Sequence, residues 1–408
     1  MMPAAVFECA FSKPSSVAKP RRKPGTSSRS RALLVAMLLA TPACPAVAAP
    51  TAHIERFGIA EDGNEVHLVT LTNDNGMVVK ISSRGGTITE ILVPDRDGNF
   101  GNVVLGVTGF EAWEKLIGFN AITGRFANRI GDGGFKLDGT FYPLPGNPNT
   151  KVTLHGGYPS FSAKIFEAYL GKAADRAAAT FRLVSPDGDN GFPGEVTLDA
   201  VYSLGNDDTL RIEYIAETTK PTVINLTNHA YFTLGTHQSG PIYDQILQVN
   251  ASNWTPTDGN QVPTGEIRDV TGSPFDFRRP RPMRETIYST DPQILLARGL
   301  DHNFVLDGYD KGNLHVAVRL ADPASGRQLE VRTTEPGVQL FSTNGTGGTI
   351  DAGNGLTIRQ SDALAIETQH FPDSPNKPHF PSTVLRPGET FRSVTEFAFS
   401  TDEQPFDW

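Results

Sequence analysis

Cysteine is almost absent from the chain. The 408 residues include two, Cys9 and Cys44, and both lie in the first 49 residues. If that segment is removed, no disulfide, thiolate metal site or cysteine nucleophile remains. The sequence also lacks the HExxH, GxSxG and P-loop patterns, and it has no paired Cys or His at metal-ligand spacing. No motif therefore implies a metal or an organic cofactor.

Long apolar runs are missing too. The run ALLVAMLLA at 32–40 has nine residues, which is too short to span a membrane. A basic segment precedes it, and the small-residue site Ala46-Val47-Ala48 follows. This order predicts a cleaved export signal over 1–49, a mature domain over 50–408, and a periplasmic or secreted protein with no other membrane contact. The alternative is a disordered basic tail on a cytoplasmic protein.

Positive charge is scarce beyond residue 49. Seven of the 36 basic residues and one of the 45 acidic residues lie in 1–49, so 50–408 carry 29 basic and 44 acidic side chains, a formal charge of −15. A domain this acidic is a poor candidate for binding the phosphate backbone of nucleic acids. It is also long enough to be stabilised by an apolar core alone.

What the sequence has in quantity is turn and strand signals. Asp-Gly occurs seven times, which supplies the positive φ angles that tight hairpins require. Apolar and polar residues alternate over 210–217, 314–320 and 390–400, as they do in half-buried strands. One short helical pattern, GFEAWEKL, covers 109–116. The sequence predicts an all-β protein, a large and mostly antiparallel β-sandwich in one domain.

Several polar residues do not follow the strand alternation. They lie tens of residues apart, in GRFANRIG (124–131), LHGG (154–157), NLTNHAYF (225–232), GLDHNF (299–304), EPGVQLF (335–341) and AIETQHFPDS (365–374). Each has an ordinary structural explanation: a solvated turn charge, a turn residue, a satisfied core histidine, a cap or a strand-edge charge.

Glu367 and His229 are the hardest to explain in that way. Glu367 continues the apolar run 364–366, and His229 interrupts the strand-like stretch NLTNHAYF. Burying a carboxylate or an imidazole is unfavourable unless the group is paired or needed for function. One buried acid and one buried base, with amides and an arginine nearby, are suited to moving protons on a polyol.

The six stretches, with SPFDFR (273–278) and LRPGETF (385–391), resemble the aldose 1-epimerase (galactose mutarotase) family in order over most of 60–399. The resemblance implies a large β-sandwich of the galactose mutarotase type. It further implies interconversion of the α and β anomers of a free aldose, such as glucose or galactose, with neither metal nor cofactor. His370 departs from the family, which more often has an amide at this position.

The resemblance also implies roles for individual residues. His229 matches the general acid of the family and Glu367 its general base. The positions that hold the sugar ring and hydroxyls match Asn128, Arg129, His155, Asp301 and Gln339. Because an imidazole is mostly neutral at pH 7, we expect Glu367 and Asp301 to raise the pKa of His229 and favour the imidazolium.

Two other classes of function remain open at this point. The first is a sugar-binding protein without catalysis, which would not need a matched acid and base. The second is a glycoside hydrolase or lyase on a similar sandwich, with Asp301 and Glu367 as its two carboxylates. A phosphosugar epimerase is a closer variant, but these stretches contain no additional Arg/Lys cluster for a phosphate.

Overall fold

A computed structural model describes residues 49–172, 175–353 and 355–402. The predicted export signal at 1–49 thus lies almost entirely outside the described residues. No helix in the described ranges is long and apolar enough to cross a membrane.

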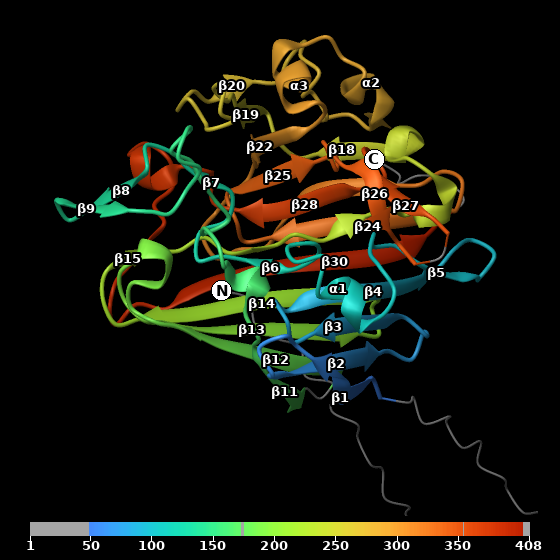
Figure 1. The fold of residues 1–408 in the computed structure, drawn as a ribbon. Helices are drawn as coiled ribbons and strands as arrows, with labels where there is room; N and C mark the ends of the chain where they lie inside the picture. The colour runs from blue at the N-terminus through green and yellow to red at the C-terminus, as the bar shows by residue number, and fades with distance from the viewer. Residues whose placement is uncertain (1–48, 173–174, 354, 403–408) are drawn as a thin grey trace, which may run out of the picture. The chain divides into compact units, whose positions relative to one another are not determined.

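The largest element is a nine-stranded sheet in which every neighbouring pair is antiparallel. Figure 1 shows its long strands β12, β13, β14 and β30 side by side. Its order is β11 (Glu167–Lys172), β12 (Arg176–Ser185), β13 (Val196–Gly205), β14 (Thr209–Thr218), β30 (Phe391–Thr401), β24 (Arg327–Thr333), β23 (His315–Ala321), β18 (Ile246–Val249) and β21 (Arg281–Pro282).

Two smaller antiparallel sheets pack against the large one. The first has the order β1 (Thr51–Ile59), β2 (Glu65–Thr72), β3 (Val78–Ser82), β4 (Thr87–Pro94) and β5 (Phe100–Asn102). The second has the order β17 (Tyr231–Phe232), β28 (Leu364–Gln369), β25 (Gly337–Phe341), β22 (Asp301–Val305), β19 (Asn253–Thr255) and β20 (Arg268–Asp269). A bridge between Val104 and Phe232 joins them, so they form one layer opposite the nine strands.

One apolar core lies between these layers. It contains side chains from all three sheets, among them Val69, Val79, Leu198, Ile212, Val331, Val338, Ile366 and Phe397. The alternation read from the sequence accounts for them, since Leu210, Ile212, Tyr214 and Ala216 are all buried on β14. The predicted all-β, mostly antiparallel sandwich is confirmed.

Helices are few and short in the described residues. The pattern at 109–116 forms only the four-residue α1 (Phe110–Trp113), and α2 (Arg284–Ile287) and α3 (Pro292–Ala297) were not predicted. For α3 the sequence did carry a signal: the Asp291 side chain accepts a hydrogen bond from the Gln293 backbone, with Pro292 in the first turn.

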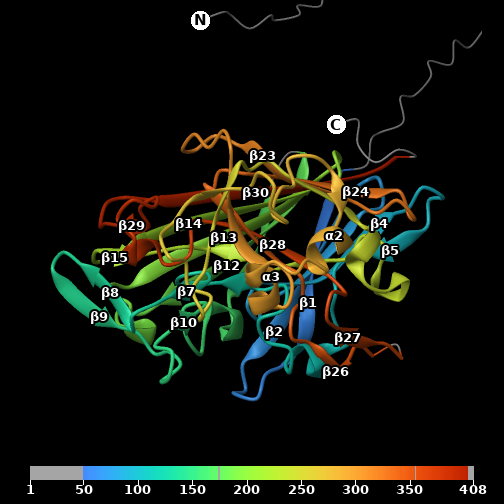
Figure 2. The same ribbon diagram turned by 90° about the horizontal axis from the view of Figure 1, so that it is seen from above.

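Five strand pairs complete the fold, and three of them position the site. The hairpin β8–β9 lies at one edge of the molecule in both ribbon views (Figures 1 and 2). The stretch NLTNHAYF, which reads as one interrupted strand, forms two separate two-residue strands, β16 and β17. The pairs are β6 (Ile122–Thr123) with β16 (Thr227–Asn228), β7 (Arg129–Ile130) with β10 (Thr153–Leu154), β15 (Thr222–Val223) with β29 (Val384–Leu385), β8 (Gly134–Leu137) with β9 (Thr140–Pro143), and β26 (Gly347–Asp351) with β27 (Thr357–Arg359).

Candidate functional site

The face of the six-stranded sheet that points away from the core carries the site. Thr368 on β28 contacts Thr395 on β30 of the opposite layer, 2.5 Å between hydroxyl oxygens. Because side chains alternate along a strand, Glu367 must face the other way. Gln339 on β25 lies directly opposite Glu367 in the register, so both side chains project from the same outer face.

His229 reaches this face from the short segment between β16 and β17. Its neighbour Asn228 turns away, and its amide donates to the Asn120 carbonyl and the Tyr202 hydroxyl, 3.3 Å each. The His229 ring stacks on Tyr231 at 4.8 Å, and its Nε2 lies 3.4 Å from Glu367 Oε1. The interruption of the strand pattern therefore places an imidazole beside the carboxylate.

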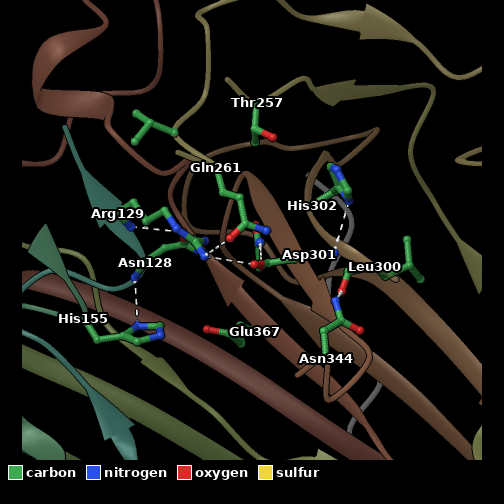
Figure 3. Close-up of polar contacts among 12 residues, drawn as sticks. Asn128, Arg129, His155, Thr257, Gln261, Leu300, Asp301, His302, Asn344 and Glu367 are labelled. Carbon is green, nitrogen blue, oxygen red and sulfur yellow. Dashed lines mark hydrogen bonds and ion pairs between the residues drawn. The ribbon is translucent and has the colours of Figure 1, made fainter. Parts of the chain in front are cut away.

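Asn128 and His155 come from the ends of β7 and β10. Both have a left-handed backbone conformation, with φ of 61° and 53°. The Asn128 backbone N–H donates to His155 Nδ1 at 3.1 Å, and the His155 N–H donates to the Asn128 carbonyl at 2.9 Å. Figure 3 shows the Glu367 carboxylate pointing toward the His155 ring. The turn glycines that follow His155 let the chain fold back at this point.

An ion-pair network joins the remaining predicted residues. Arg129 Nη2 donates to Asp301 Oδ2 at 3.0 Å, and Gln339 Nε2 donates to Asp301 Oδ1 at 2.6 Å. Arg129 Nη2 also donates to Gln261 Oε1 at 3.0 Å (Figure 3). The sequence analysis missed Gln261, because it lies in a loop of turn residues, DGNQ, that carries no other chemical signal. The structure brings all seven predicted residues together.

Several polar atoms in the site are buried without a partner among the described residues. They are Glu367 Oε2, Gln339 Oε1 and His229 Nδ1. Unsatisfied buried polar atoms are rare in folded proteins, because each one loses its hydrogen bonds to water. Three unpartnered oxygen and nitrogen atoms within one cluster of side chains indicate a ligand that forms hydrogen bonds.

Burial sets the protonation of the acid–base pair. It raises the pKa of Glu367 well above its usual value, with a smaller contribution from the nearby Asp301 carboxylate. Burial also lowers the pKa of His229 to about 4, and Asp301 only partly opposes this. The expectation of a raised imidazole pKa is thus wrong, since loss of solvation outweighs the neighbouring charge. Burial therefore favours placing a shared proton on Glu367 and not on His229.

His155, His229 and Glu367 also form a geometric candidate for a metal site, with ligand atoms within 4.8 Å of one another. The hydrogen bonding of His155 argues against it. Because Nδ1 accepts the Asn128 N–H, a neutral His155 carries its proton on Nε2. Burial lowers the pKa of His155, which keeps it neutral. His155 therefore presents its Nε2–H as a hydrogen-bond donor. The lone pair on Nδ1, which a metal ion would need, is already used by the Asn128 N–H.

A surface cavity of about 800 Å³ borders the site at His155 and His229. His155, His229 and Tyr231 line its inner end, and the exposed side chains of Leu154 and Tyr158 lie at its rim. Small-molecule sites have volumes of this order. The cavity gives a soluble ligand a path to His229.

Comparisons with known proteins agree with this geometry. The chain is 40% identical over 348 residues to galactose mutarotase from Mus musculus, covering 84% of this chain and 97% of that protein. It is 35% identical over 349 residues to aldose 1-epimerase from Escherichia coli K12, covering 85% and 98%.

Solved structures lead to the same group. The galactose 1-epimerase from Lactobacillus acidophilus superimposes with a TM-score of 0.76 at 28% identity, covering 86% of this chain and 99% of that one. An aldose epimerase homologue from C. elegans gives 0.73 at 28% identity, covering 82% and 98%. A sequence profile described as aldose 1-epimerase matches residues 67–398. The chain belongs to the aldose 1-epimerase family.

Proposed function

We propose that the protein interconverts the α and β anomers of a free aldose, such as glucose or galactose, without a cofactor. The observation that carries the proposal is the pairing of His229 Nε2 with Glu367 Oε1 at 3.4 Å in a buried, hydroxyl-binding pocket. Anomer exchange requires one group that takes a proton from the C1 hydroxyl and another that gives a proton to the ring oxygen.

Glu367 takes the C1 proton and His229 donates to the ring oxygen. The C1–O5 bond breaks and leaves an aldehyde, a neutral imidazole and a protonated carboxyl. Rotation about C1–C2 presents the other face of the aldehyde. His229 then removes the O5 proton as O5 attacks C1, and Glu367 returns its proton to the C1 oxygen.

The protonation pattern of the free site favours this sequence. Burial favours neutral Glu367 and neutral His229, which is the state that ring opening produces. The ion-pair state that starts the reaction contains the same number of protons. Sugar hydroxyls that donate to the unpartnered Glu367 Oε2 stabilise the carboxylate when the substrate binds. When the sugar is bound, the ion-pair state and the neutral state of His229 and Glu367 therefore differ less in free energy.

The other predicted residues hold the sugar. Arg129 and Gln339 keep Asp301 fixed, and Gln339 Oε1 remains available to accept from a hydroxyl. His155 presents an N–H, as its bond to Asn128 requires. Each Asp301 oxygen already accepts a hydrogen bond, so this carboxylate is poorly placed to act as the second catalytic carboxylate of a hydrolase.

Polarimetry tests the proposal directly. Fresh α-D-glucose, α-D-galactose and a pentose should each reach anomeric equilibrium faster with the protein than without it. A release assay on oligosaccharides should show no hydrolysis. Sugar binding without any acceleration would instead support a non-catalytic sugar-binding protein.

We further propose that the protein is exported after cleavage near Ala48 or Ala49. The support is the order of a basic segment, a nine-residue apolar run and the Ala46-Val47-Ala48 site. N-terminal sequencing of the natural product should begin at Ala49 or Pro50. A cytoplasmic product that retains Met1 would contradict the proposal.

A further inference from the structure

A second cavity, of about 810 Å³, shares no lining residue with the seven-residue sugar site. Its walls come from the loop before β23, the turn between β24 and β25, the residue after β28, and the segments around β29 and the start of β30. The residues that matter here are Tyr309, Lys311, Glu335, His370 and Thr383. The proposed mechanism uses none of them.

A buried carboxylate–imidazole pair lies in the wall of this cavity. Glu335 is 2% exposed, and its Oε2 lies 2.5 Å from His370 Nδ1. A buried carboxylate–imidazole contact contributes little to stability by itself, because desolvation offsets most of the attraction. The carboxylate does fix the ring, since Nδ1 donates to it and Nε2 is left as the remaining polar atom of His370. In a neutral imidazole, that nitrogen accepts hydrogen bonds.

Thr383 supplies an independent observation. Its side chain lines the cavity and is 5% exposed, yet its Oγ1 has no hydrogen-bond partner among the residues described. A hydroxyl both donates and accepts, so Thr383 Oγ1 can bind either end of a ligand hydroxyl. The Tyr309 ring offers an apolar face in the same wall.

We propose that this cavity is a second binding site for an uncharged polyhydroxy ligand, a sugar or polyol. His370 Nε2 and Thr383 Oγ1 accept from ligand hydroxyls, and Glu335 holds the His370 ring in place. Lys311, at the rim, is not required for an uncharged ligand.

The second site touches the elements that carry the catalytic pair. His370 is three residues beyond Glu367, and its backbone N–H donates to Asn225 Oδ1 at 3.0 Å. Asn225 Nδ2 donates back to the His370 carbonyl at 3.1 Å. Asn225 begins the stretch that leads to His229. A ligand bound to His370 therefore contacts a residue that follows Glu367 in the chain and is hydrogen-bonded to the stretch that carries His229.

The test uses methyl α-D-galactopyranoside, whose C1 oxygen is methylated so that it cannot be turned over. Calorimetry on the mature protein should give two sites per chain. NMR of the protein labelled with ¹⁵N-histidine should show shifts in the His370 ring signals as well as in those of His229.

Variants separate the two sites. Thr383→Val should weaken the second site roughly threefold to tenfold, as expected for one neutral hydrogen bond. Glu335→Gln should weaken it about tenfold, because the ring loses its charged partner. Both variants should keep kcat within about twofold. Lys311→Ala is the matched control at the rim and should leave both sites unchanged.

Three results would overturn the proposal. They are a stoichiometry of one, His370 signals that do not move at saturating sugar, and equal second-site affinity in wild type and Thr383→Val. Titration with inorganic phosphate covers the main rival ligand. Binding of phosphate that Lys311→Ala abolishes, with no binding of the galactoside, would mark the cavity as an anion site.

Discussion

Among the described residues, two buried carboxylate–imidazole pairs, Glu367 with His229 and Glu335 with His370, differ in how completely they are bonded. Glu367 and His229 lie 3.4 Å apart on its outer face, and Glu367 Oε2 and His229 Nδ1 lack partners among the described residues. Glu335 and His370 lie at the end of β28 with their closest atoms 2.5 Å apart. The residue types are the same, but the first pair is loose and incompletely bonded, and the second is closed.

The same two residue types can serve two different purposes, and the number of free hydrogen-bonding atoms distinguishes them. A pair that transfers protons to a substrate needs free atoms and a gap that the substrate can enter. A pair that only orients a ring needs a short bond between its own members. The presence of a buried acid and base does not by itself indicate catalysis. The hydrogen-bonding atoms that are left without a partner do. The predictions below test this contrast.

The largest expected effect is on turnover. Glu367→Gln and His229→Asn should each lower kcat by about 10²–10⁴, the usual contribution of one positioned proton-transfer group. The matched changes in the closed pair, Glu335→Gln and His370→Asn, should keep kcat within about twofold. Polarimetry at saturating glucose measures all four variants. Similar losses in both pairs would remove the distinction.

A smaller effect is expected on substrate binding. Gln339→Ala should raise KM roughly threefold to tenfold with less change in kcat, because it removes hydrogen bonds made equally in the bound and transition states. Asn128→Ala should act in the same way. Gln261→Ala removes one acceptor of Arg129 and should raise KM less. Gln360→Ala is the control, because this exposed amide donates to the Arg298 carbonyl and not to a site residue.

Stability should change in opposite directions in the two pairs. Because the folded-state pKa of Glu367 is raised, its contribution to stability is fully present below the unfolded value of 4.5 and is lost as pH rises through the folded value. Glu367→Gln should therefore raise the Tm at pH 8 by about 1–2 °C for each kcal/mol gained. Glu335→Gln breaks a bonded pair and should lower it.

Calorimetric scans at pH 5 and pH 8 check this prediction. The gain in Glu367→Gln should be smaller at pH 5 than at pH 8, because the raised pKa of Glu367 favours the neutral carboxyl more at the lower pH. A Tm for Glu367→Gln below that of wild type at pH 8 would mean that the buried carboxylate is stabilised by its surroundings.

The smallest effect concerns the pH dependence of kcat/KM. The active form of the His229–Glu367 pair carries one proton in total. Activity should fall at low pH, where His229 is protonated while Glu367 is still neutral, and at high pH, where Glu367 ionises and the pair has no proton left. Asp301 raises the pKa of both groups, so Asp301→Asn should move both limbs to lower pH. Limbs that stay in place at constant ionic strength would show that Asp301 acts on the sugar alone.

Much of the fold could be predicted from local patterns. The alternation over 210–217 and 390–400 predicted β14 and β30, because one face of each strand packs in the core. The seven site residues came from their resemblance to a family, since they lie in six distant stretches that no spacing rule connects. The structure supplied what brings them together, the register of β22, β25 and β28.

Other features depend on tertiary contacts that no local pattern contains. The pKa of His229 is lowered because the rings of Tyr231 and Phe341 pack around it and exclude water. The neighbouring charges, which were the only guide in the sequence, predicted the opposite shift. Gln261 reaches Arg129 from a turn 132 residues away. The second cavity is formed by loops whose sequences carry no periodic signal. These contacts join residues that are distant in the chain, so local sequence patterns do not predict them.

The position of β30 has a consequence for how the chain folds. This strand, Phe391–Thr401, comes after β15 to β29 in the chain, yet it pairs with β14 on one side and β24 on the other, near the middle of the largest sheet. The sheet cannot close until the ribosome has released this segment. Pairings between residues distant in sequence also form slowly. The largest sheet therefore stays open until β30 has been synthesised, and without this strand the edges of β14 and β24 are exposed to aggregation.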